Sequence, residues 1–473
     1  MKDPTTLTLR RAAGAIAQGR LHAEELVEAN LDRIRRSQPK LNCFIRTTAE
    51  AARTGARAAD AAVKAGRSLG PLHGIPLAHK DMFYRAGEVC SCGSKIRADF
   101  VPDHTATVLT RLGDAGGIDL GRLNMAEFAM GPTGHNEQYG RCRNPWNPDY
   151  ITGGSSSGSG AAVAAGLVFA ALGSDTGGSV RLPAAACGVV GIKPTLGRVS
   201  RHGTMPLSHS LDCIGVLARS VGDCARLLSV IAGADDCDGA ASRRAVPDYE
   251  RDLDDAVTAG ALAGITIGVP DRYYCDGIDD EVAQLLVASR AILEKQGAKI
   301  VDVSVGDHGA INDLSNAVLW PEAATLHLPW LRDRPQDYAP QSRARLLVGL
   351  GVPATLYMEA VLARAQLLDE LLRQTFSNCD VLHVPVLRRP VPTAKETDVG
   401  GGADMAKVLG QIVANTRPFN FFGLPGLSVP IGLTRNGLPQ AMQLVARPFC
   451  EQLLFRVGAA YEATAGRMDR PRI

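Results

Sequence analysis

The sequence predicts an α/β protein with a mixed central β-sheet covered by helices on both faces. The first observation is periodic: in residues 21–36, leucine, valine and isoleucine recur at three- and four-residue steps, which is typical of a helix lying on a core. The second is that helical and strand-like stretches alternate along the chain. The alternation runs through residues 42–46 (strand), 49–64 (helix), a strand ending at Lys80, then 107–112, 265–269, 279–294 and 299–303.

The amino-acid composition limits the classes of protein to which this chain can belong. The 473 residues are 45% hydrophobic and 21% charged, so the chain can bury a large core. The 51 basic and 49 acidic residues are interspersed and nearly cancel, so we expect neither nucleic acid nor a membrane as partner. The opening residues lack the apolar core of a signal peptide, and the longest apolar run, 161–172, is too short to cross a bilayer. The sequence therefore predicts a soluble, cytoplasmic protein.

No motif indicates a metal or a cofactor. The eleven cysteines are scattered and odd in number, which favours reduced core thiols over a disulfide framework. The ten histidines include no pair at zinc-ligand spacing. The chain also lacks a phosphate-binding glycine loop, so we expect no bound metal and no cofactor.

The most informative stretch is 153–194, where Ser155 and Ser179 lie in separate glycine-rich loops at the two ends of an alanine-rich run. We expect that run, 161–172, to be a helix. Glycine allows backbone N–H groups to turn toward a bound atom, which suits a serine nucleophile beside an oxyanion pocket. Upstream, the apolar run 73–80 carries Lys80 into a buried strand. A nucleophilic serine needs a base, and Lys80, Ser155 and Ser179 could form such a relay.

These segments resemble the amidase-signature family. Its motifs are present as Gly-Gly-Ser-Ser at 153–156, Asp-Thr-Gly-Gly-Ser-x-Arg-x-Pro at 175–183 and Cys-Gly-x-x-Gly-x-Lys-Pro-Thr at 187–195. The resemblance implies one large domain over 1–473, with a core signature at about 71–220 and a divergent substrate-pocket region at about 305–415. It also implies that Lys80 takes a proton from Ser155, which sits on a cis peptide and takes one from Ser179. Ser179 would then attack the carbonyl carbon and form an acyl-enzyme.

The same resemblance implies roles for residues around the relay. The backbone N–H groups of Thr176, Gly177 and Gly178, with that of Ser179, would form the oxyanion hole. Asp175 and Arg181 would hold the Ser179 loop in shape. The residues expected to bind substrate are Met130, Gly131, Ser156 and Trp320.

These residues also admit three other interpretations. The glycine and serine run on its own is typical of a flexible linker. Residues 154–158 also match Gly-x-Ser-x-Gly, which would make Ser156 the nucleophile of an α/β-hydrolase, but residues 144–152 show no strand pattern before it. Lys80 alone would be read as a side chain with a buried stem and a solvated charge. His79 should point to the opposite face of the strand from Lys80.

The favoured function is hydrolysis of the C–N bond of a small linear amide. The alternatives are the A subunit of a tRNA-dependent amidotransferase, which releases ammonia from glutamine for a partner, and a carbamate- or urea-type hydrolase. That subunit carries an Ala-Arg-Tyr-Asp-Gly-like segment and an acidic residue before a late Pro-x-Asn-x-x-Gly-x-Pro, and residues 316–324 and 412–418 show neither. A non-catalytic scaffold is disfavoured because the three relay residues are intact.

The divergent region gives a mild preference for the substrate. It concentrates rings in a chain otherwise poor in aromatics, which favours an aryl or bulky apolar amide, unless the rings only pack helices. These rings are Trp320, His327, Trp330, Tyr338 and Tyr357. Residues 233–246 and 388–402 read as surface loops, the second as a lid over a pocket. The expected partner is a small-molecule amide, and a homodimer is left open.

Overall fold

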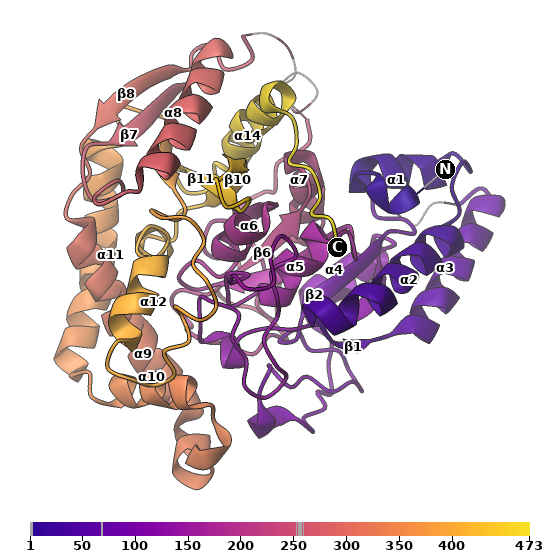
Figure 1. The fold of residues 1–473 in the computed structure, drawn as a ribbon, viewed down its shortest axis with the longest axis horizontal. Coiled ribbons are helices and arrows are strands. Elements are labelled where there is room, and N and C mark those ends of the chain that lie inside the picture. Colours follow the sequence, from indigo (N-terminus) through magenta and orange to yellow (C-terminus); the bar gives the residue numbers. More distant parts are fainter. Residues whose placement is uncertain (1–2, 68–69, 252, 254–257, 259) are drawn as a thin grey trace.

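A computed structural model describes residues 3–67, 70–251, 253, 258 and 260–473. Within these residues, one sheet runs in the order β1-β3-β2-β4-β6-β5-β10-β11-β9-β7-β8 (Figure 1). β2 pairs in parallel with β3 and β4, whereas β4, β6, β5, β10 and β11 pair antiparallel in turn, so the sheet is mixed as predicted. The strands are β1 (Phe44–Thr47), β2 (Pro76–Lys80), β3 (Ile118–Leu123), β4 (Ala170–Asp175), β5 (Val190–Lys193), β6 (Cys213–Ala218), β7 (Thr266–Pro270), β8 (Lys299–Val303), β9 (Val381–Pro385), β10 (Gly426–Leu433) and β11 (Pro439–Ala446).

Helices flank this sheet. Figure 1 shows α1 to α3 near one end of the molecule and α8 to α11 near the other. The helices are α1 (Leu9–Ala17), α2 (Ala23–Leu41), α3 (Ala49–Lys64), α4 (Thr107–Asp114), α5 (Ser157–Ala164), α6 (Arg181–Cys187), α7 (Val221–Ile231), α8 (Asp280–Lys295), α9 (His308–Asp333), α10 (Pro340–Leu350), α11 (Ala354–Gln374), α12 (Met405–Val413), α13 (Arg417–Phe421) and α14 (Glu451–Ala465).

Most predicted elements lie where the sequence placed them. The helix predicted at 49–64 and the strand predicted at 299–303 match α3 and β8, and residues 233–246 contain no helix or strand. The prediction for 161–172 was wrong, because the helix ends at Ala164 and residues 170–172 begin β4. The whole run is buried, so it lacks the polar face that would separate a helix from a strand by periodicity.

The helices offer no simple candidate for a membrane span. No single helix among the described residues is long and apolar enough to cross a bilayer, although α10 and α11 pass together as a pair bent by 88°.

Candidate active site

The carboxyl ends of two parallel strands bring the lysine and serine side chains together. β2 and β4 run in parallel, so Lys80 at the end of β2 lies beside Ser174 near the end of β4. Lys80 is 0% exposed, and its Nζ donates to Ser155 Oγ at 2.7 Å and to Ser174 Oγ at 2.8 Å. The expected contact between Lys80 and Ser155 is thus formed, and Ser174 is a partner that the sequence analysis missed. His79 points to the other face, into a cavity lined by α3 and α4.

Ser155 lies in a tightly packed turn. The Gly154–Ser155 peptide bond is cis, as the family resemblance implies. A Cβ on Gly154 would lie 2.4 Å from the carbonyl oxygen of Gly131, so no larger side chain fits there. Gly131, expected to contact substrate, therefore lies directly against the Ser155 turn.

Ser179 lies in the loop that precedes α6 and is partly exposed, whereas Ser155 is buried. The N–H of Ser156 donates to the carbonyl oxygen of Ser179 at 3.3 Å, which joins the two serine loops. Within the described part of the chain, the Ser179 hydroxyl has no hydrogen-bond partner. The expected link from Ser155 to Ser179 is therefore not formed here. Catalytic hydrogen bonds of this kind often tighten only when substrate is bound.

A buried ion pair shapes the Ser179 loop. Asp175 accepts hydrogen bonds from the N–H groups of Gly178, Val180 and Arg181 at 2.8–3.3 Å, and from the Arg181 guanidinium at 2.8 and 3.0 Å. Burial alone would raise the pKa of Asp175, but the Arg181 charge and hydrogen bonds hold that pKa well below its ordinary value. The guanidinium also donates to Thr416, Asn420 and Gln443. These contacts support the loop-holding role expected for both residues.

One of the four backbone N–H groups predicted to form the oxyanion hole is already hydrogen-bonded within the loop. The Gly178 N–H donates to Asp175 Oδ1 at 2.8 Å, so it is directed at a carboxylate because the loop wraps around that side chain. The N–H groups of Thr176, Gly177 and Ser179 donate to no other atom of the described residues. These three are the donors that remain for a developing oxyanion.

Burial changes the protonation of Lys80. It lowers the pKa of the Lys80 ammonium from 10.5 to about 7, although the charges of Asp212 and Asp175 oppose this change. Near neutral pH, a large share of molecules then carries an amine that can accept a proton. A lysine in water would be almost entirely protonated there.

The remaining predicted substrate residues divide into two groups. Ser156 is 0% exposed and its hydroxyl donates to the Ser174 carbonyl at 3.3 Å, so we assign it to positioning rather than to substrate contact. Met130 is buried, and its carbonyl accepts a hydrogen bond at 3.4 Å from Gln341 of α10. Trp320 of α9 is partly exposed and lies beneath the guanidinium of Arg345.

Most rings of the divergent region pack against one another. Phe128 contacts His327, Trp330 and Tyr338, with ring centroids 4.4, 5.7 and 5.9 Å away, and His327 Nδ1 lies 2.8 Å from the Tyr338 hydroxyl. Tyr357 donates to a carboxylate of α9 at 3.1 Å. The four rings of the divergent region named here, His327, Trp330, Tyr338 and Tyr357, therefore serve helix packing. They give no support to the expected aryl pocket.

Backbone hydrogen bonds attach residues 388–402 to the segment before the Ser155 turn. The Ile151 N–H donates to the Pro392 carbonyl at 3.1 Å, and the Ala394 N–H to the Asp149 carbonyl at 2.8 Å. A Cβ on Gly401 would lie 3.0 Å from the Pro340 carbonyl oxygen at the start of α10. The segment thus covers this side of the protein, and its role as a moving lid stays a prediction.

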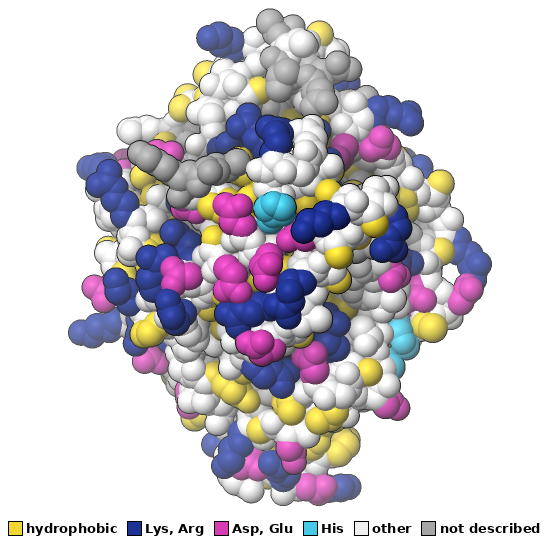
Figure 2. Space-filling model, turned by 90° about the vertical axis from the view of Figure 1, so that its right-hand side faces the viewer, with side chains coloured by type: hydrophobic (Ala, Val, Ile, Leu, Met, Phe, Trp, Pro, Cys, Tyr) yellow, Lys and Arg dark blue, Asp and Glu magenta, His cyan; other side chains and the backbone are white. Residues whose placement is uncertain are grey.

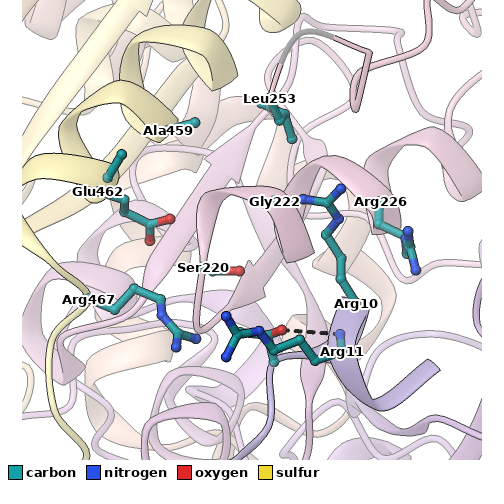
Figure 3. A pocket seen from close by; sticks show the side chains of 11 residues that line it. Arg10, Arg11, Ser220, Gly222, Arg226, Leu253, Ala459, Glu462 and Arg467 are labelled. Atoms are coloured by element: carbon teal, nitrogen blue, oxygen red, sulfur yellow. Dashed lines mark hydrogen bonds between the residues drawn. The ribbon is translucent and has the colours of Figure 1, made fainter. Parts of the chain in front are cut away.

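Another cavity lies away from these residues, between α1, α7 and α14, with a volume of about 580 Å³ (Figure 3). Its charges are partly paired, because Arg226 Nε lies 2.6 Å from Glu250. None of the predicted site residues lines it. On the face drawn in Figure 2, basic and acidic side chains lie side by side without a field of one sign, in keeping with the charge pattern of the sequence.

A comparison of the sequence with models of protein families shows the family of this chain. The family model described as Amidase matches residues 25–455. The chain belongs to the amidase family. Among described residues, no group of three or more histidine, cysteine, aspartate or glutamate side chains is placed to hold a metal ion.

Several individual members of the amidase family are similar to this chain over nearly its whole length. The chain is 39% identical to the A subunit of the Glutamyl-tRNA(Gln) amidotransferase of Chloroflexus aurantiacus, over 99% of this chain and 98% of the relative. It also resembles a solved structure described as a vestigial complex that reveals the origins of an s-triazine catabolic enzyme (TM-score 0.90, 33% identity, 99% and 100% coverage). A third match is a 6-aminohexanoate cyclic dimer hydrolase bound to substrate (TM-score 0.88, 28% identity, 99% coverage of each chain). The name of the Chloroflexus aurantiacus relative agrees with the amidotransferase alternative better than with the favoured free-standing hydrolase.

Proposed function

We propose that the protein hydrolyses a carboxamide through an acyl-enzyme on Ser179. The observation that carries this proposal is the buried Lys80 amine 2.7 Å from Ser155 Oγ, with its pKa lowered to about 7. Neutral Lys80 accepts the Ser155 proton while Ser155 accepts the Ser179 proton, and Ser179 Oγ bonds to the carbonyl carbon. Returning the proton to the leaving nitrogen releases ammonia or an amine, and water then hydrolyses the ester.

Two functions, which differ in the amide that is hydrolysed, fit this chemistry. The names of the curated relatives support the A subunit of an amidotransferase, in which glutamine is the ammonia donor and a partner protein uses the ammonia. A free-standing hydrolase of another amide is the second candidate. Residues 412–418 favour this candidate, because they lack the acidic residue that the amidotransferase subunit carries before its late motif. They also place Arg417 beside the Ser179 loop.

The test is ammonia release by the purified chain from glutamine and a panel of aliphatic, aryl and ureido amides, with Ser179→Ala as the inactive control. A fluorophosphonate should add to Ser179, as shown by intact mass and peptide mapping. An adduct on Ser156 or on a cysteine would contradict the mechanism. So would activity that a chelator abolishes and zinc restores. Activity that requires tRNA and a partner protein would select the amidotransferase, whereas full activity of the chain alone would select the hydrolase.

A further inference from the structure

Helices α10 and α11 expose an apolar surface. Among the described residues, thirteen large hydrophobic side chains are exposed, and seven of them lie within residues 347–362. These seven, which we call the α10–α11 surface, are Leu347, Val348, Leu350, Leu356, Met358, Val361 and Leu362, with 36–71% of each residue exposed. Three residues, 351–353, join the two helices, so the end of α10 adjoins the start of α11. Figure 1 shows α11 at the left edge of the molecule, so this continuous surface faces outward.

The exposed apolar side chains of α11 recur at helical spacing. Steps of three and four separate the exposed residues Met358, Val361, Leu362 and Ala365. A stripe of this kind normally faces a core. α11 packs against α9 through a different side of the helix, where Tyr357 donates to Glu322 of α9 at 3.1 Å and Ala360 is buried. The outer stripe thus has the pattern of a packed face, but no element of the described chain covers it.

Charged residues are absent from the centre of this surface. Residues 346–358 contain no aspartate, glutamate, lysine or arginine, although these residues make up 21% of the chain. Glu359 lies beside the stripe of α11, and the exposed Asp369 and Arg373 pair with each other farther along the helix. An apolar centre with a polar rim is the composition of a protein–protein interface.

The exposed area approaches what a stable dimer needs. The exposed fractions of the seven residues amount to about 600 Å², at the top of the range for the largest apolar patch on a typical monomer. A specific interface buries about 800 Å² on each partner. Thr355, Glu359 and Gln366, which line a shallow groove beside Met358 and Leu362, would supply much of the remainder.

We propose that the α10–α11 surface is a twofold interface with a second copy of this chain. A twofold contact places the same surface on both sides, and a surface without charge at its centre does not repel its own copy. Interfaces of homodimers are also more apolar than those of transient complexes, which fits this composition. The stripe of α11 then packs against the same stripe of the second copy. Such a dimer is independent of the reaction proposed at Ser179.

A lipid surface is the other class of occupant for an exposed apolar helix, and the sequence disfavours it. Helices that lie in a membrane interface are rich in lysine and arginine on the polar side and carry tryptophan, phenylalanine or leucine on the apolar side. Residues 346–374 contain no lysine, tryptophan or phenylalanine. Arg364 of α11 donates to the Ser210 carbonyl at 2.8 Å, and Arg373 is paired with a carboxylate. Neither arginine of α11 is therefore left to bind anionic headgroups.

The test measures the mass of the full-length wild-type protein by sedimentation velocity and light scattering over a wide range of concentrations. The protein should have twice the mass of one chain. Matched substitutions then locate the interface. Val348→Glu places a carboxylate from each copy in the apolar centre, so the dissociation constant of the dimer should rise by about 30- to 1,000-fold, the range of an interface hot spot. Leu362→Glu should act in the same way from α11.

Val287→Glu is the matched control. Val287 lies on α8 and is 57% exposed, against 56% for Val348, so both substitutions add the same charge at a valine of equal exposure. The control variant should be as dimeric as the wild type. Circular dichroism should show that all three variants fold, because each substituted side chain is exposed. Backbone deuterium exchange in residues 354–366 should be slower in the wild type than in Leu362→Glu.

Loss of the dimer in Val348→Glu or Leu362→Glu, but not in Val287→Glu, would support the interface. A wild-type protein that is monomeric at every concentration would overturn it, and binding of this monomer to phosphatidylcholine vesicles would assign the surface to lipid instead. A dimer that survives both Val348→Glu and Leu362→Glu would place the contact elsewhere. Equal dissociation of all three variants would also contradict the assignment, because the control lies outside the α10–α11 surface.

Discussion

Replacing Lys80 by arginine should slow amide hydrolysis by orders of magnitude while the protein still folds. Lysine can serve as the base only when it is neutral, and a guanidinium stays protonated in proteins. Lys80→Arg keeps the positive charge near Ser155 and Ser174. A residue that only holds those serines by hydrogen bonds would tolerate the change in part. A proton acceptor would not.

The structure sets the size of the effect. With its pKa lowered to about 7, Lys80 is neutral in about half of the molecules at pH 7 and in about nine-tenths at pH 8. At the ordinary value of 10.5, only about one molecule in 3,000 would be neutral at pH 7. General-base catalysis contributes about 10²- to 10⁴-fold, so kcat/KM of Lys80→Arg should fall by about that factor. Because the active form is deprotonated, wild-type kcat/KM should rise with pH around a midpoint near 7.

The assay is steady-state ammonia release between pH 5.5 and 9, with circular dichroism and melting temperature to check folding. Lys193→Arg is the matched control, because Lys193 is also fully buried but its Nζ donates to the Pro194 carbonyl at 3.1 Å. That variant should lose stability yet keep most of its activity per folded molecule. A Lys80→Arg protein with more than a tenth of wild-type kcat/KM, or a wild-type profile flat from pH 6 to 9, would refute the reasoning.

Two further substitutions test the Ser179 loop. Gly178→Ala should destabilise the protein by about 2–5 kcal/mol and abolish activity, because Gly178 has φ +130° and a Cβ would lie 2.2 Å from Thr416 Oγ1. Thermal melting checks this against Gly410→Ala, a helical site with open space, which should gain up to about 1 kcal/mol. Asp175→Asn should cost about 3–5 kcal/mol by leaving a buried guanidinium unpaired, whereas Asp236→Asn, in an exposed pair, should change stability by less than about 1 kcal/mol. Equal melting temperatures for the two aspartate variants would argue against the buried pair as the support of the loop.

How far the sequence predicts this site depends on how local each feature is. Lys80, Ser155 and Ser179 lie in short motifs, and the contact of Lys80 with Ser155 follows from them. The orientation of the Gly178 N–H does not, because it depends on how the loop folds around Asp175. Periodicity also separated exposed helices from strands correctly, but it failed for 161–172, where no face meets water.

The anchoring of Arg181 has a consequence for the order in which the protein matures. All three residues of the proposed relay lie in the first 179 positions, but the guanidinium that braces the Ser179 loop is held by Thr416, Asn420 and Gln443. A ribosome completes these anchors only near the end of synthesis. A nascent chain or an N-terminal proteolytic fragment therefore contains Ser179, the proposed nucleophile, without the contacts that hold its loop in place. We therefore expect the proposed activity to begin only after the segment that carries Gln443 has been made.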